Sequence, residues 1–187
     1  MIGGLRLGIV KSIVGTFRLA VGLLLTCGLA VSLMLTSSNA GSQEKTKDGK
    51  LKDYSMGSTV RDDWKKINLV DFQFYLPGDM KDQKVRGIDS AVWDYRNDCL
   101  RLAIDYGMYS NDLKSLASQP NHDSEWVLIN CQKAYVVTCR YEKSYISAVH
   151  FPALWDSDTK LTFYVEGKSD NTQKIAREIF QSIKFRK

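Results

Sequence analysis

The sequence predicts an α+β fold, in which a mainly antiparallel sheet of about six or seven strands is covered by a C-terminal helix. Three observations carry this prediction. Short apolar segments recur along the chain, turn-forming residues separate them at hairpin spacing, and an amphipathic segment closes the sequence. Strands that follow one another through short turns, with one helix packed on them, form an α+β layer architecture.

The first strands are predicted from alternating apolar and polar residues. Residues 71–76 alternate and end at the breaker pair Pro77 and Gly78. Residues 88–95 and 100–106 are expected to form the next two strands. The first predicted elements of the sheet are therefore a half-buried strand and then a hairpin.

The turn of that hairpin is expected at Asn97 and Asp98. A two-residue turn there would pair Asp94 with Arg101, so that opposite charges meet on one face of the hairpin. The other face would then be apolar and would collect Ala91, Trp93, Leu102 and Ile104.

The remaining strands follow a short segment, residues 109–118, which is expected to be helical. Apolar alternation then predicts a hairpin and two further strands. These are expected at residues 125–130 with 134–141, at 145–151 and at 161–166.

The last element is predicted to be a helix from Asn171 to about Ile183. Asp170 is placed to cap its first turn, with Gln173 at the matching third position. One face of the helix is apolar and carries Ile175, Ala176, Ile179 and Ile183.

The first forty residues have the pattern of a secretory signal. Their charges are three basic residues, residues 19–35 are an uncharged and mostly apolar run, and Ser38 to Ala40 form a small-residue cleavage site. We therefore expect a signal peptide over residues 1–40, a flexible polar linker over 41–60 and one α+β domain over 61–187. The alternative is an uncleaved leader, whose 17-residue apolar run would anchor the domain outside the cytoplasm.

Charge gives no indication of a nucleic-acid partner. The chain has 26 basic and 21 acidic residues, and the leader holds three of the basic ones and none of the acidic ones. The remaining near balance is unlike the one-sided patch of a protein that binds nucleic acid or an anionic membrane surface. We therefore expect a protein partner or a membrane-associated complex.

Three cysteines lie outside the leader, in a domain expected to reach an oxidising compartment. Cys131 and Cys139 are eight residues apart along one predicted strand. That separation is roughly 26 Å, too far for a disulfide. If the strands all run antiparallel, Cys99 and Cys131 lie at the same end of the sheet and form the candidate disulfide. The alternative is three reduced thiols that pack as small apolar groups.

The sequence contains no recognisable catalytic or metal-binding motif. His122 and His150 have no cysteine or aspartate at a ligand spacing, and a metal site needs several converging ligands. There is no Gly-x-Ser-x-Gly elbow and no glycine-rich phosphate loop. We predict no catalytic residue, no metal and no cofactor.

A candidate binding surface follows the strand at 100–106. Asp105, Tyr106 and Tyr109 flank a glycine at the strand end, and Trp155 precedes a polar turn. Binding residues collect on loops held by a rigid scaffold, and aromatic anchors are frequent at interfaces. The alternative for each aromatic residue is packing into the core.

The domain resembles the PsbP-like fold group from about Asp71 to Phe185. The likeness lies in Phe-Gln-Phe-Tyr-Leu-Pro at residues 72–77, in the strand pair around 129–137, and in Ile-Ala-Arg-Glu-Ile-Phe-Gln-Ser-Ile-Lys-Phe at 175–185. Cys131 departs from it, because such proteins often have glycine there, and no metal-site motif of the photosystem II member is matched. The group includes that extrinsic lumenal protein, a Ran-binding nuclear-transport factor and exported bacterial proteins of unknown role.

The resemblance implies a non-catalytic accessory or binding module, although a shared fold does not fix the partner. We therefore expect an exported module that docks on a larger extracytoplasmic or membrane-associated complex, in the periplasm, a lumen or the extracellular space. The alternative is an extracytoplasmic hydrolase-type enzyme with a site built from scattered Asp, Ser and Tyr residues. A docking module should show an exposed apolar patch, whereas an enzyme should show a pocket of converging ionisable groups.

Overall fold

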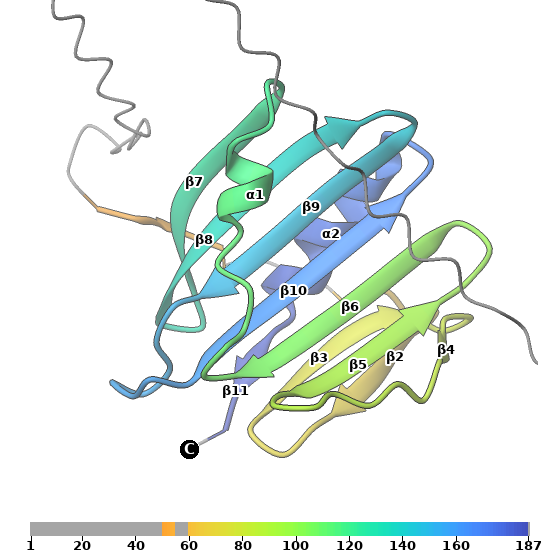
Figure 1. Ribbon diagram of the computed structural model, residues 1–187. Helices are drawn as coiled ribbons and strands as arrows, with labels where there is room; N and C mark the ends of the chain where they lie inside the picture. The colour runs from red at the N-terminus through yellow and green to blue at the C-terminus, as the bar shows by residue number, and fades with distance from the viewer. Residues whose placement is uncertain (1–49, 55–59, 187) are drawn as a thin grey trace, which may run out of the picture. The chain divides into compact units, whose positions relative to one another are not determined.

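The computed structural model describes residues 50–54 and 60–186, so the expected signal peptide lies outside the described residues. The described part is mostly β structure with two helices (Figure 1). Its main sheet has eight strands, and all neighbouring strands in it pair antiparallel except β1 and β7, which pair in parallel. Their order is β1 (Lys52–Asp53), β7 (His122–Ile129), β8 (Gln132–Tyr141), β9 (Ser144–Phe151), β10 (Lys160–Gly167), β6 (Leu100–Gly107), β5 (Ala91–Arg96) and β4 (Lys81–Asp82).

A second sheet has three strands in the order β11 (Lys184–Phe185), β3 (Phe72–Pro77) and β2 (Trp64–Asn68). This corrects the expectation that residues 71–76 belong to one continuous sheet. The alternation of β3 was read correctly, because Phe72, Phe74 and Leu76 are all buried. Their side chains face the main sheet, where the ring of Phe163 lies 5.1 Å from that of Phe74. β3 therefore packs against the main sheet as part of a separate layer.

Helix α2 (Asn171–Gln181) and the second sheet lie on the same face of the main sheet, called here the back face (Figure 1). The predicted C-terminal helix is confirmed, with Ala176, Ile179 and Ile183 buried in the core. Asp170 does not cap the helix with its side chain. Its backbone is already helical, with φ −58° and ψ −28°, whereas a capping residue adopts an extended conformation that turns its carboxylate toward the helix N–H groups.

The β5–β6 hairpin keeps the predicted faces but has a different register. Arg96 pairs with Arg101 and Tyr95 with Leu102, a shift of two residues from the expected pairing. The turn still has two residues, but these are Asp98 and Cys99, because the backbone N–H of Asn97 donates to the carbonyl of Leu100 at 3.0 Å. The side-chain oxygen of Asn97 accepts hydrogen bonds from the backbone N–H groups of Cys99 (3.0 Å) and Leu100 (2.7 Å) and so holds the turn in this position. A two-residue shift preserves the faces, since side chains alternate with period two.

The chain does not form a simple meander after β6. Four antiparallel pairings separate β6 from β7, so these two strands run parallel. The connection between them holds the short helix α1 (Lys114–Ala117) and crosses the front face of the sheet (Figure 1). The predicted helix at 109–118 is thus a single turn within this crossover.

The expected disulfide between Cys99 and Cys131 is wrong, because both thiols are free. Cys99 precedes β6 and Cys131 follows β7. Since these strands run parallel, the two cysteines lie at opposite ends of the sheet. Cys139 is also free and is buried.

The expected linker differs from the structure at residues 50–54. Lys52 and Asp53 pair in parallel with Val127 and Leu128, and Tyr54 is buried. Tyr54 donates a hydrogen bond to Glu125. Part of the polar segment is therefore docked on the edge strand β7. Among the described residues, none of the helices is long and apolar enough to span a membrane.

Candidate functional site

The described residues 50–54 and 60–186 leave part of the front face of the main sheet open. The crossover segment packs on β8 and β9 through a small apolar cluster in which Leu113 contacts Val137 and Ala148. The strands β10, β6 and β5 lie beyond this segment (Figure 1). A sheet face with one covered half and one open half leaves room for a ligand or a partner.

A groove of about 610 Å³ occupies this open half, and we call it the front groove. Its volume lies in the range of ligand-binding clefts. Apolar and polar side chains from the sheet, the crossover and the loop before β5 form its lining. The apolar ones are Val85, Val92, Trp93, Ala103, Ile104, Leu113, Leu116 and Tyr164, and the polar ones are Asp94, Arg101, Asp105, Asn111, Ser115 and Thr162.

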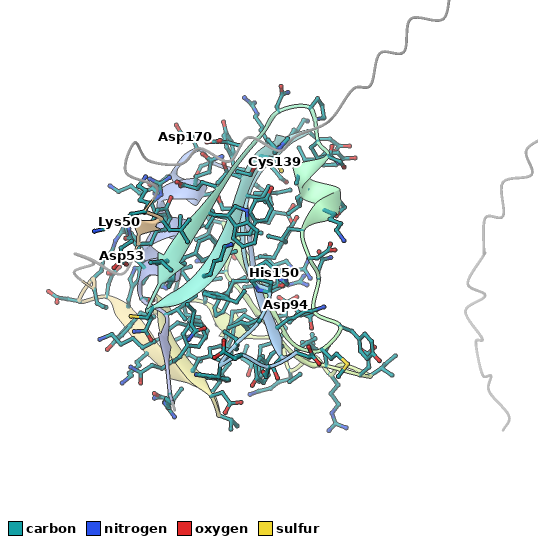
Figure 2. All side chains as sticks on the ribbon, turned by 90° about the vertical axis from the view of Figure 1, so that its left-hand side faces the viewer. Lys50, Asp53, Asp94, Cys139, His150 and Asp170 are labelled. Atoms are coloured by element: carbon teal, nitrogen blue, oxygen red, sulfur yellow. The ribbon has the colours of Figure 1, made fainter. Side chains whose placement is uncertain are left out.

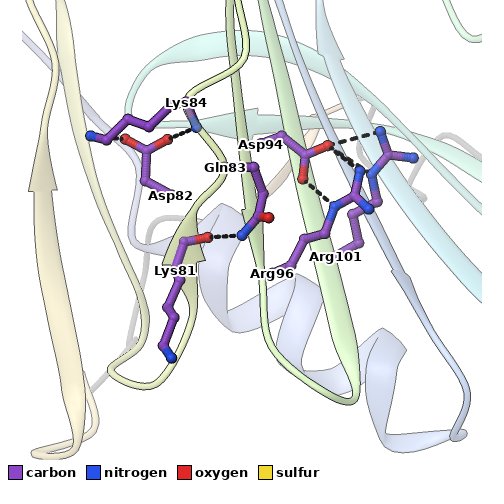
Figure 3. A network of polar contacts seen from close by, with 7 residues as sticks. All are labelled: Lys81, Asp82, Gln83, Lys84, Asp94, Arg96 and Arg101. Carbon is purple, nitrogen blue, oxygen red and sulfur yellow. Dashed lines mark hydrogen bonds and ion pairs between the residues drawn. The ribbon is translucent and has the colours of Figure 1, made fainter. Parts of the chain in front are cut away.

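The buried carboxylate of Asp94 and the guanidinium of Arg101 form part of the groove lining, and Arg96 binds the same carboxylate from outside the groove (Figure 3). Asp94 accepts two hydrogen bonds of 2.8 Å from Arg96, and Nε of Arg101 donates to it at 3.0 Å. The hydrogen bonds from Arg96 are the largest cause that lowers the pKa of Asp94, and those from Arg101 act in the same direction. Asp94 and Arg101 both line the groove, so this carboxylate holds the guanidinium of Arg101 in a fixed position there.

A buried polar cluster closes one end of the groove. Nδ1 of His150 lies 2.9 Å from Oγ1 of Thr162, and this hydroxyl donates to the carbonyl of Asn111 at 2.7 Å. The hydroxyl of Ser110 lies 2.7 Å from the same oxygen. Oδ1 of Asp105 is buried without a hydrogen-bond partner. Figure 2 shows that His150 and Asp94 lie on the side of the sheet that carries α1.

The polar cluster is suited to holding the crossover segment rather than to proton transfer. His150 is buried, and this burial lowers its pKa, so the imidazole is neutral at pH 7. The hydroxyl hydrogen of Thr162 is directed at the carbonyl of Asn111 and the residue is buried, so this hydroxyl fixes the crossover segment to the sheet. His122 lies at the start of β7, where its Nδ1 is 2.8 Å from the carbonyl of Gln119. The described ranges 50–54 and 60–186 contain no cluster of three potential metal ligands.

Two loops beside the front groove expose apolar side chains, and we call them the apolar loops. Val85 and Ile88 lie in the loop before β5, and Met108 and Tyr109 lie in the loop after β6. A Cβ placed on Gly107 would lie 3.2 Å from the Ser90 side chain, so the two loops are adjacent at this end of the sheet. Of six exposed large hydrophobic residues in the described part of the chain, these loops hold four.

The four residues predicted as a binding surface do not form one surface. Asp105 lines the front groove and Tyr109 belongs to the apolar loops. Tyr106 points to the back face, where it donates a 2.6 Å hydrogen bond to Asp71 and packs on the core. Trp155 packs on Phe185, with 6.0 Å between the ring centroids. Tyr106 and Trp155 therefore pack against the core, which was the alternative to a binding role.

Sequence reasoning missed most of the groove. The sequence places Arg101 on the charged face of a hairpin, where nothing indicates a cavity. Leu113 and Leu116 cover part of the sheet from a segment with no long periodic pattern. Ile88 was assigned to a strand although it is fully exposed. The only available signal was a pair of apolar residues, Val85 and Ile88, in a segment bounded by Lys84 and Asp89.

Comparisons with known proteins do not assign the chain to a family. No family model matches it, and no curated protein matches it significantly. Among the solved structures that resemble it is a protein from Bacteroides thetaiotaomicron VPI-5482, with 16% identity and a TM-score of 0.39. The match covers 62% of this chain and 45% of that one, so this protein spans less than half the length of that neighbour.

Proposed function

We propose that this protein is an exported binding module that docks, without catalytic chemistry, on a protein of a larger extracytoplasmic or membrane-associated complex. The observation that carries the proposal is the gathering of four exposed apolar side chains on two adjacent loops beside an open groove. Monomeric proteins rarely expose contiguous apolar surface unless a partner covers it. The front groove and the apolar loops together are the proposed docking surface.

The chemistry of the docking surface favours a partner segment with apolar side chains and a carboxylate. Val85, Val92 and Leu116 offer apolar contacts along the groove. Arg101 uses Nε and Nη2 on Asp94 and keeps a side-chain exposure of 43%, so its remaining N–H groups are accessible. A guanidinium positioned by one carboxylate can bind a second one from a partner.

The enzyme alternative, with a hydrolytic site of scattered Asp, Ser and Tyr residues, has less support. The hydroxyls of Ser110 and Thr162 are buried and bonded to each other or to backbone carbonyls. An activated nucleophile needs an accessible hydroxyl that gives its proton to a base, whereas the hydroxyl of Thr162, although 2.9 Å from Nδ1 of His150, is buried and donates to the carbonyl of Asn111. The proposal includes export, either with cleavage after Ala40 or with an uncleaved leader that anchors the domain. It also includes membership of the PsbP-like group.

Site-specific photo-crosslinking in the native host tests the docking surface. A photoreactive amino acid in place of Ile88 should give one discrete adduct with a partner protein. The matched control is Val70, which is also an exposed aliphatic residue but lies between β2 and β3, away from the apolar loops. Cross-linking from position 70 should give no such adduct.

A second change tests whether the groove takes part. Ala103→Trp places a large ring on the groove floor and should abolish the adduct from position 88, while circular dichroism shows that the domain stays folded. The docking proposal is refuted by equal cross-linking from positions 88 and 70, or by an adduct that Ala103→Trp leaves unchanged.

A further inference from the structure

A row of polar side chains crosses the back face of the main sheet where apolar residues would be expected. Along β7, β8 and β9 the back-face positions are mostly apolar, as at Val127 and Val149. At one end of these strands, however, the register places Asp123 opposite Thr138 and Thr138 opposite Ser147. Side chains directly opposite one another on one face are neighbours, so the three form a continuous row.

This row lines a cavity of about 120 Å³, which we call the back cavity. Gln173 and Arg177, four residues apart on α2, form a second wall, and Tyr54 forms a third. Ser147 is only 1% exposed, and its hydroxyl has no hydrogen-bond partner. A buried polar group without a partner is costly, so an unpaired hydroxyl at a polar cavity points to a missing partner.

Opposite charges without ion-pair partners face this cavity. Among the described residues no carboxylate lies within ion-pair distance of Arg177, whose guanidinium lies 5.5 Å from the ring centre of Tyr54. Asp123 likewise has no ion pair in the described part of the chain, and both residues line the cavity. Glu125 differs, because it accepts the hydrogen bond of Tyr54 and lies 3.8 Å from Lys52.

We propose that the back cavity binds a small zwitterion of amino-acid size. At roughly 30 Å³ per water molecule its volume is about four times that of one water, so it can hold a small organic molecule but not a large one. Arg177 binds the carboxylate with two parallel hydrogen bonds, and Asp123 accepts from the ammonium group. Ser147 supplies a further hydrogen bond from the floor. The site lies on the face opposite the front groove and is independent of the docking function.

Calorimetric titration of the purified full-length chain in mild detergent, with L-alanine as the probe, tests this site. We expect saturable binding with one site per chain. Acetate and methylammonium, which carry one charge each, should bind at least tenfold more weakly. Arg177→Gln and Asp123→Asn should each weaken alanine binding at least tenfold. Both residues are exposed, so these variants should fold, and their thermal midpoints check this.

Lys174→Gln is the matched control, because Lys174 is an exposed cation on the same helix that does not line the cavity. Its alanine affinity should equal that of the unmodified protein. The proposal is overturned by the absence of saturable binding up to about 10 mM alanine, tenfold above a millimolar Kd. Equal binding by Arg177→Gln, or acetate binding as tight as that of alanine, overturns it as well.

Discussion

Ile179→Ala should destabilise the domain strongly, because the C-terminal helix is held mainly by its apolar face. Ile179 is fully buried, where α2 packs on the main sheet. The change removes three carbon groups, and at about 0.8 kcal/mol for each the lost burial amounts to about 2.4 kcal/mol. A residual cavity of about 50 Å³ would add about 1.2 kcal/mol, at roughly 24 cal/mol per Å³. The free energy of unfolding should therefore fall by about 3.6 kcal/mol.

Urea unfolding followed by far-ultraviolet circular dichroism measures this loss. The midpoint should move to lower urea while the slope stays unchanged, since the surface exposed on unfolding is nearly the same. Lys174→Ala is the control, because Lys174 is exposed on the same helix. That change should alter stability by no more than about 0.5 kcal/mol. A loss below about 1 kcal/mol for Ile179→Ala, or equal losses for both variants, would refute the docking of α2 through this face.

The remaining predictions concern charge and thiols. The folded-state pKa of Asp94 is lowered, so its contribution to stability is present above the ordinary aspartate pKa of about 3.9 and is lost as the pH falls through the folded value. Asp94→Asn should thus flatten the fall in stability on acidification, and an unchanged acid limb in thermal melts would contradict this. In a Cys27→Ser background, Ellman's reagent should titrate Cys99 and Cys131 at once and Cys139 only after unfolding, because Cys139 is buried. A native protein with no fast thiol would instead indicate the disulfide.

The sequence predicted those features that depend on residues close together along the chain. The alternation of Phe72, Phe74 and Leu76 correctly marked a strand with one buried face. The helical period around Ile179 correctly marked the buried face of α2. Side-chain period is a local property of strands and helices, so it can be read without knowing which elements pack together.

Local pairing was less well determined. The faces of the β5–β6 hairpin were predicted correctly, but the two-residue turn lies one position later than expected, at Asp98 and Cys99, so Asp94 meets Arg101 diagonally. Backbone and side-chain hydrogen bonds both contribute to the position of a turn. The identity of two central residues therefore does not determine where the turn lies. The helix cap at Asp170 failed for a similar reason, since it depends on a backbone angle that the residue type does not fix.

Only the tertiary structure decided the direction of β7 and the composition of both candidate sites. The crossover through α1 makes β7 parallel to β6, and this alone separates Cys99 from Cys131. Tyr54 reaches Glu125, 71 residues further along the chain, and thereby completes a wall of the back cavity. Alternation records which face of a strand is buried but not which segment buries it. That choice is made by the packing of whole elements, whose contacts lie far apart in sequence.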